Sequence, residues 1–567
     1  MTIKVAIVGA GAYSSSDRNE QQTYYTTREF PGISGLATAK QCLAEGFLVT
    51  VFEARDNIGG QWYYEEPDPA TSEAQSSMYE GTISNTCRDT SSFSDFPMDP
   101  ARYPDFYGHR SSLQYLHEYA DYFGLKQHIL FNTKVVSCQQ VEDNRWKIQY
   151  TTKHQEPRET VYDAVLVCSG KSTKPHIPAF KGMESFQGRI FHSHIYRRPE
   201  GFSGKRVAII GFSNSAADIA SEICGQTEEC HLVTRRGGWV LPRYIFGKSI
   251  HAWNSRFSQS VLPASISKWS LTTLIQLVEG KLPPELQPEH DILGANPAIH
   301  SSLIENIKVG RITPHRASVG EITATGLSLT NGETINNLDA IILCTGYDID
   351  YPFLSEDCYR SKHSKFMDSP NSVHLYRLTV SPHIRNLFIM GVFQLPGPIQ
   401  PAVELQARWV TAILTGRIKL PPAERMSELI ASEEEERARQ WIQSDRHTVS
   451  AHFLPYCDSL ANDLGAAPTF GRLLSRIFSF SSNPIRAIPI LHAVYFGMCS
   501  SAQYRLFGDG SKPEIATATI LRLARGGKQL SEEEKIALTK KSEGTSASAV
   551  SHVDNIIVDD AKDAKGV

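Results

Sequence analysis

The 567 residues exceed the size of one ordinary domain, and 41% hydrophobic and 21% charged residues exclude a disordered or fibrous chain. The formal net charge of −4 gives no basic surface for a polyanion, so we expect no nucleic-acid partner. The ten cysteines lack the paired spacings of zinc or redox sites, and no apolar run reaches the roughly 18 residues of a membrane span. We therefore expect no metal and a cytoplasmic location, with peripheral membrane contact left open.

The first expected element is a buried β-strand at Val5–Val8, because four apolar residues run directly into Gly9-Ala10-Gly11. A strand, the pattern GxGxxG and a helix together form a dinucleotide site, in which backbone amides and the helix N-terminus meet a pyrophosphate. Here the pattern is interrupted after Gly11. Removing the 21 residues Ala12–Gly32 would join Gly11 to Ile33-Ser34-Gly35 and complete the pattern in front of a helix at Leu36–Ala44.

Two interpretations of the interrupting segment are open: a genuine surface loop, or translated intron sequence in a predicted gene. We favour the intron as a hypothesis, because 21 codons are 63 nucleotides in frame and Phe30-Pro31-Gly32 can be encoded by a pyrimidine run followed by CAG, the pattern of a splice acceptor. A genuine loop would have to bulge away from the phosphates. Sequencing the transcript distinguishes the two, since a mature message that encodes Tyr13–Pro31 would contradict the intron hypothesis.

A second strand and its terminal acid extend the first site. Val49–Phe52 predicts a strand that ends at Glu53, where an acid accepts hydrogen bonds from the adenosine ribose hydroxyls. The glycines of Asn57-Ile58-Gly59-Gly60 allow close backbone approach, and the indole of Trp62 offers a flat wall. The residues predicted to bind this first nucleotide are Gly9, Gly11, Gly35, Glu53, Gln61 and Trp62.

A second nucleotide site is predicted downstream. The apolar run Val207–Ile210 leads into Gly211-Phe212-Ser213 and a helix, although Ser213 replaces the middle glycine of the strict pattern. After the next strand, His231–Val233, Arg235 and Arg236 stand where an acid would select NADH, and guanidinium groups suit a 2′-phosphate. We therefore predict NADPH, with Arg235 as the first candidate and Arg236 as the second. The predicted contacts are Gly211, Ser213, Asn214, Ser215, Ala216, Asp218, Arg235 and Arg236.

A repeated segment indicates how the two sites share the chain. Residues 162–170 and 338–346 each contain a short apolar run, Ala164–Val167 or Ala340–Leu343, followed by Cys-Ser-Gly or Cys-Thr-Gly. This similarity suits one nucleotide domain inserted into another, with the chain leaving near 170 and returning near 340. We predict an α/β protein with two dinucleotide-binding, Rossmann-like domains, the second inserted into the first, plus a helical C-terminal region.

The sequence beyond Gly416 is helical in pattern. Glu433–Glu436 is interpreted as a solvated helix face, and Ser531-Glu532-Glu533-Glu534 resembles a capping box that opens one last helix. After about Lys541 the chain is rich in Ser, Ala, Asp and Lys and is expected to be disordered. The predicted segments are 1–178 and 336–425 for the first domain, 179–335 for the NADPH domain with a helical insertion, 426–540 for the helical region and 541–567 for the tail.

Several segments resemble one family. Phe186–Arg197 is similar to the FxGxxxHxxxY(K/R) signature of flavin-containing monooxygenases, whereas their Baeyer–Villiger relatives carry tryptophan where Tyr196 stands. The resemblance covers about residues 1–525. Further similar segments are Ser84–Arg88 with Phe93–Pro97, Cys344–Tyr347, Gly391–Gln394, Glu404–Trp409 and Tyr495–Leu506.

This resemblance implies FAD in the first domain, NADPH in the second, and oxygenation by O2 of a soft nitrogen or sulfur of a small molecule through a C4a-hydroperoxyflavin. Asn85 is implied as the catalytic residue, since its amide can donate and accept hydrogen bonds. The linker position of His192 and Tyr196 favours a structural role over acid–base catalysis. The resemblance further implies Ser84, Asn85, Thr86, Val136 and Gln394 as cofactor contacts.

Alternatives stay open. Baeyer–Villiger or N-hydroxylating chemistry is possible within the oxygenases, and a non-catalytic nucleotide-binding remnant is possible because the glycine loop is interrupted. A disulfide reductase is disfavoured, since no CxxxxC dithiol follows the first nucleotide motif and Cys87 stands alone. Animal members of the family end in a hydrophobic membrane anchor, whereas this sequence ends in a polar tail, so we expect soluble behaviour. Homo-oligomerisation is left open.

Overall fold

The structure, a computed structural model, describes residues 2–9, 32–68, 74–153, 155–172, 174–360, 369–478 and 484–526. Its first sheet holds five parallel strands in the order β22-β7-β1-β2-β3. All residues of β7 and β22 are buried, as in a parallel sheet covered on both faces, and this burial explains the continuous apolar runs in the sequence. The strands are β1 (Lys4–Val8), β2 (Leu48–Phe52), β3 (Ile129–Leu130), β7 (Ala164–Val167) and β22 (Leu387–Ile389).

The second sheet repeats this arrangement with the order β16-β11-β10-β20-β9, and all of its strands are parallel as well. Both sheets place the strand that precedes a glycine turn at their centre, β1 in the first and β10 in the second. The predicted pair of Rossmann-like domains is therefore confirmed. The strands of this sheet are β9 (Arg189–His192), β10 (Arg206–Ile210), β11 (Glu229–Thr234), β16 (Thr313–Arg316) and β20 (Ala340–Leu343).

The position of β20 corrects the predicted boundary at 336. Ala340 pairs with Val207 of β10 on one side and with Arg189 of β9 on the other, so this strand belongs to the second sheet. The chain returns only after Leu343, where β21 (Tyr347–Asp348) pairs antiparallel with β8 (Lys174–Pro175) of the outgoing crossing. Each of the two similar segments lies beside the first strand of its own sheet, and their similarity alone does not tell which sheet each one joins.

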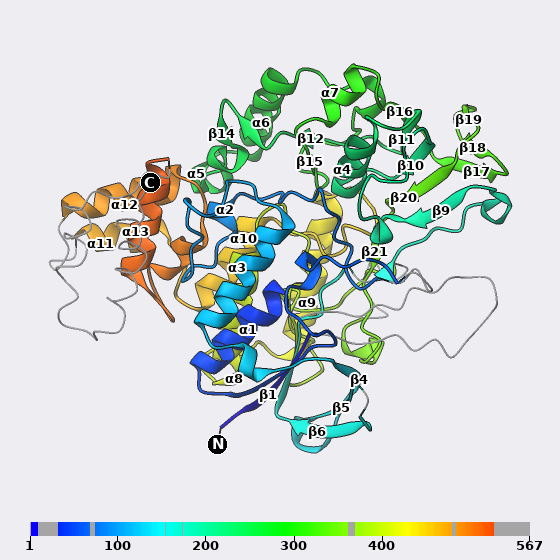
Figure 1. The fold of residues 1–567 in the computed structure, drawn as a ribbon. Coiled ribbons are helices and arrows are strands. Elements are labelled where there is room, and N and C mark those ends of the chain that lie inside the picture. The colour runs from blue at the N-terminus through cyan, green and yellow to red at the C-terminus, as the bar shows by residue number, and fades with distance from the viewer. Residues whose placement is uncertain are drawn as a thin grey trace, which may run out of the picture.

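Helices pack against both sheets (Figure 1). Helix α1 begins at Ile33 rather than at the predicted Leu36, because Ser34 and Gly35 already form its first turn, and it packs against α8 in the core of the first domain. The α-helices are α1 (Ile33–Ala44), α2 (Arg88–Ser91), α3 (His109–Tyr122), α4 (Asn214–Ile223), α5 (Arg256–Ser260), α6 (Ala264–Glu279), α7 (Leu303–Lys308), α8 (Ile399–Leu414), α9 (Ala423–Gln440), α10 (Phe453–Asp463), α11 (Phe470–Phe478), α12 (Pro484–Phe496) and α13 (Pro513–Ala524).

Smaller sheets are attached to the two domains. The antiparallel sheet β4-β5-β6 extends the first domain, and β17-β18-β19 extends the second. The remaining strands form the pairs β12-β15 and β13-β14 near the helical insertion of α5 and α6. The bounds are β4 (Thr133–Gln140), β5 (Trp146–Thr152), β6 (Arg158–Tyr162), β12 (Val240–Leu241), β13 (Tyr244–Ile245), β14 (Lys248–Ser249), β15 (Ala298–Ile299), β17 (Val319–Thr323), β18 (Gly326–Leu329) and β19 (Thr334–Ile335).

The C-terminal region is helical as predicted, but the expected solvated face of α9 is wrong in part. Glu435 and Glu436 are exposed, whereas Glu434 and Arg437 are buried, and the Arg437 guanidinium donates to the Ser450 carbonyl at 2.9 Å. The spacing of three residues places these two side chains on the same inward face of the helix. The capping box at 531–534, the tail and residues 12–31 lie outside the described residues.

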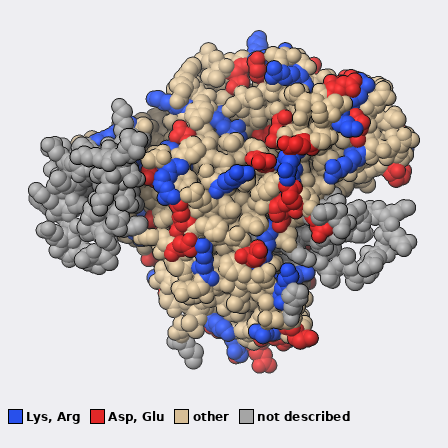
Figure 2. Space-filling view, viewed as in Figure 1, with Lys and Arg blue, Asp and Glu red and all other residues tan. Residues whose placement is uncertain are grey.

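The surface carries both signs of charge. On the face drawn in Figure 2, Lys and Arg side chains are interspersed with Asp and Glu side chains, in keeping with the small net charge. All ten cysteines are buried and none forms a disulfide. Within the described ranges, no helix is both long enough and apolar enough to cross a bilayer.

Candidate functional site

Four backbone segments meet around the end of β1 and the start of α1. The Gly9 amide at the end of β1 donates to the Phe52 carbonyl of β2 at 3.0 Å. At the start of α1, a Cβ on Gly32 would lie 3.1 Å from the Cα of Gly60, a tight contact that glycine avoids. Gly35 is buried in the first turn of α1, while Gly11 lies outside the described residues. The strand and the helix of a dinucleotide site are therefore present on either side of residues 10–31, which lie outside the described residues.

Glu53 carries an unmatched hydrogen-bond acceptor at this site. Its side chain is fully buried at the end of β2, and its Oε1 accepts from the Arg55 amide at 2.7 Å. Its Oε2 is buried and has no hydrogen-bond partner among the described residues. Burial raises the pKa of this carboxyl group well above its usual value, although the Arg55 amide opposes that rise. A buried oxygen that lacks a donor fits the ribose hydroxyls of FAD, as the strand-end position of Glu53 predicts.

Glu53→Gln is expected to weaken FAD binding about tenfold and to flatten its pH dependence. The folded chain holds the Glu53 proton to a higher pH than the unfolded chain, so between these two pKa values the folded chain loses stability as pH rises. Ribose donors favour the carboxylate, so FAD affinity of the unchanged chain should rise as the pH approaches the raised pKa of Glu53 from below. A fluorescence titration of FAD at several pH values measures both effects, and an equal pH slope in the variant would contradict this role.

Gln61 and Trp62 lie in the short 3-10 helix Gly60–Trp62 beside the same turn. The Gln61 amide donates to the Ser172 carbonyl at 3.2 Å and accepts from the Ser77 amide at 3.1 Å, so it ties three segments together. The indole of Trp62 lies 6.2 Å from the ring of Tyr107, centroid to centroid. The two aromatic rings therefore pack near each other, and the contact of Trp62 with the first nucleotide stays a prediction.

The second glycine turn is built at the C-terminal end of β10. Gly211 has a φ of +118°, and a Cβ there would lie 2.3 Å from the Cys344 carbonyl oxygen, so only glycine fits. Helix α4 begins directly afterwards, and the Asn214 side chain accepts from the Ile299 amide at 2.8 Å. The Ser213 hydroxyl, at the position where the strict pattern has glycine, accepts from Arg446 at 3.0 Å. Ser215 lies in the first turn of α4 together with Ala216, which is buried.

Sequence reasoning missed Arg446. It comes from the segment between α9 and α10, and it also donates to the Phe212 carbonyl at 3.3 Å. A cation on the phosphate-binding turn suits a pyrophosphate. No local motif marks this residue, because it lies 233 positions from Ser213 in the chain.

Arg235 and Arg236 are exposed directly after β11, where the predicted 2′-phosphate would lie. Arg236 donates to the Gln443 carbonyl at 3.1 Å, whereas the Arg235 side chain forms no hydrogen bond or ion pair with the described residues. This difference supports Arg235 as the first candidate for the phosphate.

Arg235→Ala is expected to raise the KM for NADPH about tenfold to a hundredfold, because a charge-assisted contact to the 2′-phosphate is lost. The KM for NADH should stay within about twofold, since NADH has no such phosphate. Steady-state kinetics with both nucleotides measures this, with Arg236→Ala as the matched control of smaller effect. A parallel loss for NADH would contradict the assignment.

The Asp218 side chain contacts residues at the boundary between the two domains. Its carboxylate accepts from the Tyr79 hydroxyl of the first domain and lies 3.6 Å from His300. Burial raises the pKa of Asp218 to about 6 and lowers the pKa of His300 to about 4. The described contacts of this side chain thus join the two domains, and its contact with NADPH stays a prediction.

Asn85 lies in a tightly bonded segment opposite the second domain. The Ser84 amide donates to the Tyr107 carbonyl at 2.9 Å, and the Thr86 hydroxyl lies 2.5 Å from that of Ser91. The Asn85 Oδ1 accepts from Arg243 of the second domain at 3.3 Å. A residue from each nucleotide domain therefore meets at the predicted catalytic amide, and Arg243 was not among the predicted site residues.

The two remaining predicted cofactor contacts differ in their surroundings. The Gln394 amide oxygen accepts from the Lys171 ammonium group, and burial lowers the pKa of Lys171 to about 8, with Arg446 adding to that shift. Val136 is 43% exposed on β4, at an irregular point in the pairing with β5. Gln394 thus lies beside a cation near the second glycine turn, whereas the structure gives Val136 no such neighbour.

The comparisons with known proteins cover most of the chain. The family model described as flavin-binding monooxygenase-like matches residues 30–556. The chain belongs to this family. It is 34% identical over 492 residues to dimethylaniline monooxygenase [N-oxide-forming] 2 of Rattus norvegicus, with 84% of this chain and 88% of the relative covered. It is 33% identical over 494 residues to flavin-containing monooxygenase 2 of Homo sapiens, with the same coverage of both chains.

Solved structures share the fold of this monooxygenase. S-allyl-L-cysteine S-oxygenase from Allium sativum has a TM-score of 0.58 at 24% identity, covering 82% of this chain and 88% of that one. Cyclohexanone monooxygenase from Rhodococcus sp. Phi1, bound to NADP+, has a TM-score of 0.57 at 17% identity, covering 81% and 97%. Family membership makes the chain a flavin-dependent oxidoreductase that uses FAD and NADPH, with a small-molecule substrate and O2.

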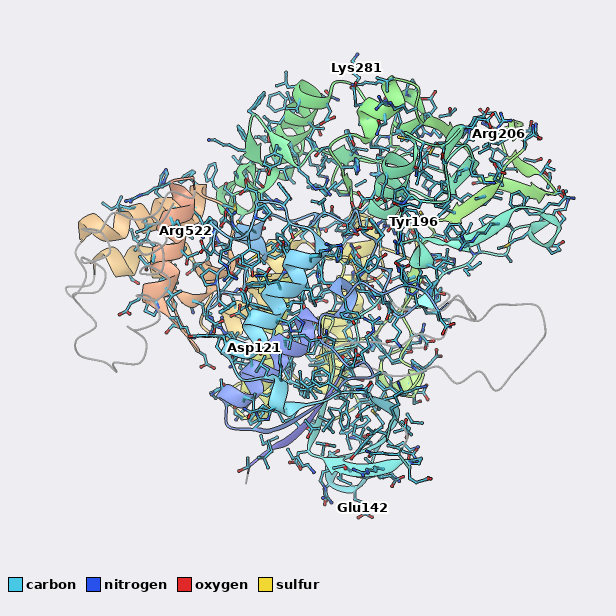
Figure 3. The ribbon with its side chains drawn as sticks, viewed as in Figure 1. Asp121, Glu142, Tyr196, Arg206, Lys281 and Arg522 are labelled. Carbon is cyan, nitrogen blue, oxygen red and sulfur yellow. The ribbon has the colours of Figure 1, made fainter. Side chains whose placement is uncertain are left out.

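The signature segment of the monooxygenase connects its two domains. The Tyr196 hydroxyl, labelled in Figure 3, donates to Glu222 of α4 at 2.7 Å, and Arg197 donates to the carbonyls of His194 and Ser76 at 2.8 and 2.6 Å. His192 is fully buried, and burial lowers its pKa to about 3, so it is neutral at physiological pH. These contacts support the structural role expected for His192 and Tyr196.

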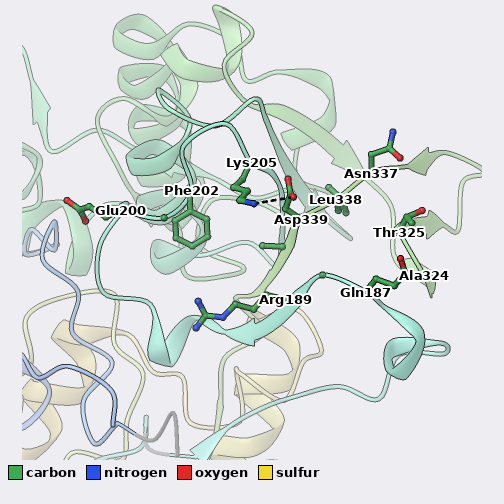
Figure 4. Close-up of a pocket in the computed structure, with 13 residues that line it drawn as sticks. Gln187, Arg189, Glu200, Phe202, Lys205, Ala324, Thr325, Asn337, Leu338 and Asp339 are labelled. Carbon is green, nitrogen blue, oxygen red and sulfur yellow. Dashed lines mark hydrogen bonds and ion pairs between the residues drawn. The ribbon is translucent and has the colours of Figure 1, made fainter. Parts of the chain in front are cut away.

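A cavity of about 450 Å³ lies away from this site (Figure 4). It is lined by Arg189, Lys205, Asp339 and Ala340, where β9, β10 and β20 begin. Ligands of parallel sheets bind at the carboxyl ends of the strands, which is the opposite edge. We therefore place the cofactors at the glycine turns and not in this cavity.

Proposed function

We propose that this monooxygenase oxygenates a soft nucleophilic nitrogen or sulfur atom of a small molecule. The observation that carries the proposal is the Asn85 amide, which lies where the first domain contacts Arg243 of the second. Tyr196 stands where Baeyer–Villiger enzymes carry tryptophan, which favours heteroatom oxygenation over oxygen insertion into a ketone. Two relatives have names in keeping with this choice, an N-oxide-forming monooxygenase and an S-oxygenase.

The residues of the chain hold and orient the reacting groups. Glu53 would accept from the ribose of FAD, and Arg235 would hold the 2′-phosphate of NADPH. Bound FAD and NADPH would supply hydride transfer and oxygen activation. Asn85 would present its amide to the groups between the two nucleotides, and the rings of Trp62 and Tyr107 would exclude water from one side.

Product analysis with four substrates tests the proposed function. The purified chain is supplied with FAD, NADPH and O2 and offered a sulfide, a tertiary amine, a primary amine and a ketone in turn. We expect a sulfoxide and an N-oxide as the main products. An ester or lactone from the ketone would favour Baeyer–Villiger chemistry, a hydroxylamine alone would favour N-hydroxylation, and an absence of bound flavin even with excess FAD would favour a non-catalytic remnant.

A further inference from the structure

We propose that Arg243 is a positioning residue that fixes the orientation of the Asn85 amide from the NADPH domain. This inference rests on the proposed function, because it concerns the amide placed at the reacting groups. Arg243 follows β12 and is only 9% exposed. It reaches across to the first domain, 158 positions away in the chain from Asn85.

The guanidinium group of Arg243 contacts three consecutive residues of the first domain. Its Nη2 donates to the Ile83 carbonyl at 3.1 Å and to the Asn85 Oδ1 at 3.3 Å, and its Nε donates to the Ser84 carbonyl at 3.2 Å. A planar guanidinium can hold several acceptors at once in a fixed geometry, whereas the ammonium group of lysine is a point charge on a flexible stem. These three contacts therefore require the guanidinium group of arginine, which lysine replaces only in part.

The chemistry of the two groups decides which way the Asn85 amide faces. A guanidinium group has only donors, so the atom of Asn85 that faces it must be the carbonyl oxygen. The NH2 group of the amide is then directed away from Arg243 and is left to donate to groups between the two nucleotides. Without Arg243 the amide can rotate, because its oxygen and nitrogen ends have nearly the same shape.

The nearest carboxylate that influences Arg243 belongs to the helix after the second glycine turn. Burial lowers the pKa of Arg243, and the nearby Asp218 carboxylate opposes that shift. Asp218 belongs to α4, the helix that follows the NADPH-binding turn, and it also accepts from Tyr79 of the first domain. The neighbouring His300 is neutral at physiological pH and adds no competing positive charge. Asp218 of α4 thus acts on Arg243 through its charge, and Arg243 contacts Asn85 directly.

The test is a double-mutant cycle in the full chain with excess FAD, using Arg243→Met, Asn85→Ala and the double variant. The measured quantities are hydrogen peroxide released per NADPH oxidised, the KM for NADPH, and hydrogen exchange of peptides spanning 79–92 without cofactors. Arg110→Met is the matched control, since the Arg110 side chain is 82% exposed on α3 and, within the described ranges, its one ion pair is with the exposed Glu80. Arg243→Lys and Arg243→Gln keep a polar side chain, and they replace Arg243→Met in the same measurements if that variant fails to fold.

We expect Arg243→Met to raise the released peroxide about tenfold with an NADPH KM within about twofold of the unchanged chain, and to speed exchange in the peptides around Ser84. Arg243→Lys should restore only part of the loss. In the Asn85→Ala background, Arg243→Met should have no further effect on peroxide release. Asn85→Asp should release as much peroxide as Asn85→Ala despite a stronger contact with Arg243, because a carboxylate has no NH2 group to donate.

Two results would overturn the inference: equal effects of Arg243→Met with and without Asn85, or unchanged peroxide release and exchange in Arg243→Met. Failure of the proposed function looks different. In that case Asn85→Ala would leave peroxide release unchanged, and neither the sulfide nor the tertiary amine would be oxygenated by the unchanged chain.

Discussion

Deleting residues 12–32 is expected to lower the dissociation constant for FAD by about a hundredfold or more. The deletion joins Gly11 to Ile33, the first residue of α1, and completes Gly9, Gly11 and Gly35 as one uninterrupted pattern. Backbone amides at the end of β1 and the N-terminus of α1 would then meet the pyrophosphate together. Two charge-assisted hydrogen bonds gained at about 1.5 kcal/mol each give an effect of this size.

Titration of FAD against the full and shortened chains, followed by flavin fluorescence, measures this effect. A matched control replaces residues 12–31 by a Gly/Ser linker of the same length, which keeps the spacing but removes the natural side chains. We expect the linker variant to bind FAD as weakly as the full chain, because the interruption itself separates the strand from the helix. FAD binding of the full chain as tight as that of the shortened chain would show that the segment is compatible with the site, and would favour a genuine surface loop.

Arg505→Met is expected to lower the free energy of unfolding by about 3 to 5 kcal/mol, because it removes one member of a buried group of charges. Arg505 lies at the end of the 3-10 helix Ser501–Arg505 and forms an ion pair with Glu404 of α8. Its Nη2 also lies 3.5 Å from Asp95, which pairs with Lys40 of α1 and, at 3.1 Å, with Lys512. This group joins the C-terminal region to the core of the first domain.

The carboxylates of this group depend on their partners. Burial alone would raise the pKa of Asp95, but Lys40, Arg505 and Lys512 together hold it below its usual value. Removing Arg505 leaves Glu404 buried with less compensation, so the double variant Arg505→Met/Glu404→Gln should recover part of the lost stability. Urea unfolding followed by tryptophan fluorescence measures the change, with Arg110→Met as the exposed control. A loss no larger than that of the control would contradict this account.

Much of the fold follows from local patterns in the sequence. The runs Val5–Val8 and Val207–Ile210 predict buried strands. A strand in a parallel sheet covered on both faces has no polar side, so its residues are apolar in succession. Glu53 is found by its place at the end of the second strand, and its orphaned oxygen agrees with that prediction. Arg235 and Arg236 are found in the same way from their place after β11.

Other features escape such patterns. The run Ala340–Leu343 predicts a strand but not its sheet, since pairing partners are chosen by strands far apart in the chain. Glu434 was expected on a solvated face, yet the helix turns it inward together with Arg437. The contacts of Asp218 with Tyr79 and His300 at the domain boundary are not visible in local patterns either.

The sequence by itself determined two nucleotide-binding turns, their strands and the acid and cations beside them, because each depends on residues within a few positions of one another. Only the tertiary structure decided that Arg243 faces Asn85, that Arg446 covers Ser213 and that Arg505 pairs with Glu404. These contacts join residues more than 100 positions apart, and hydrogen bonds and ion pairs act over a few ångströms of space whatever the separation along the chain.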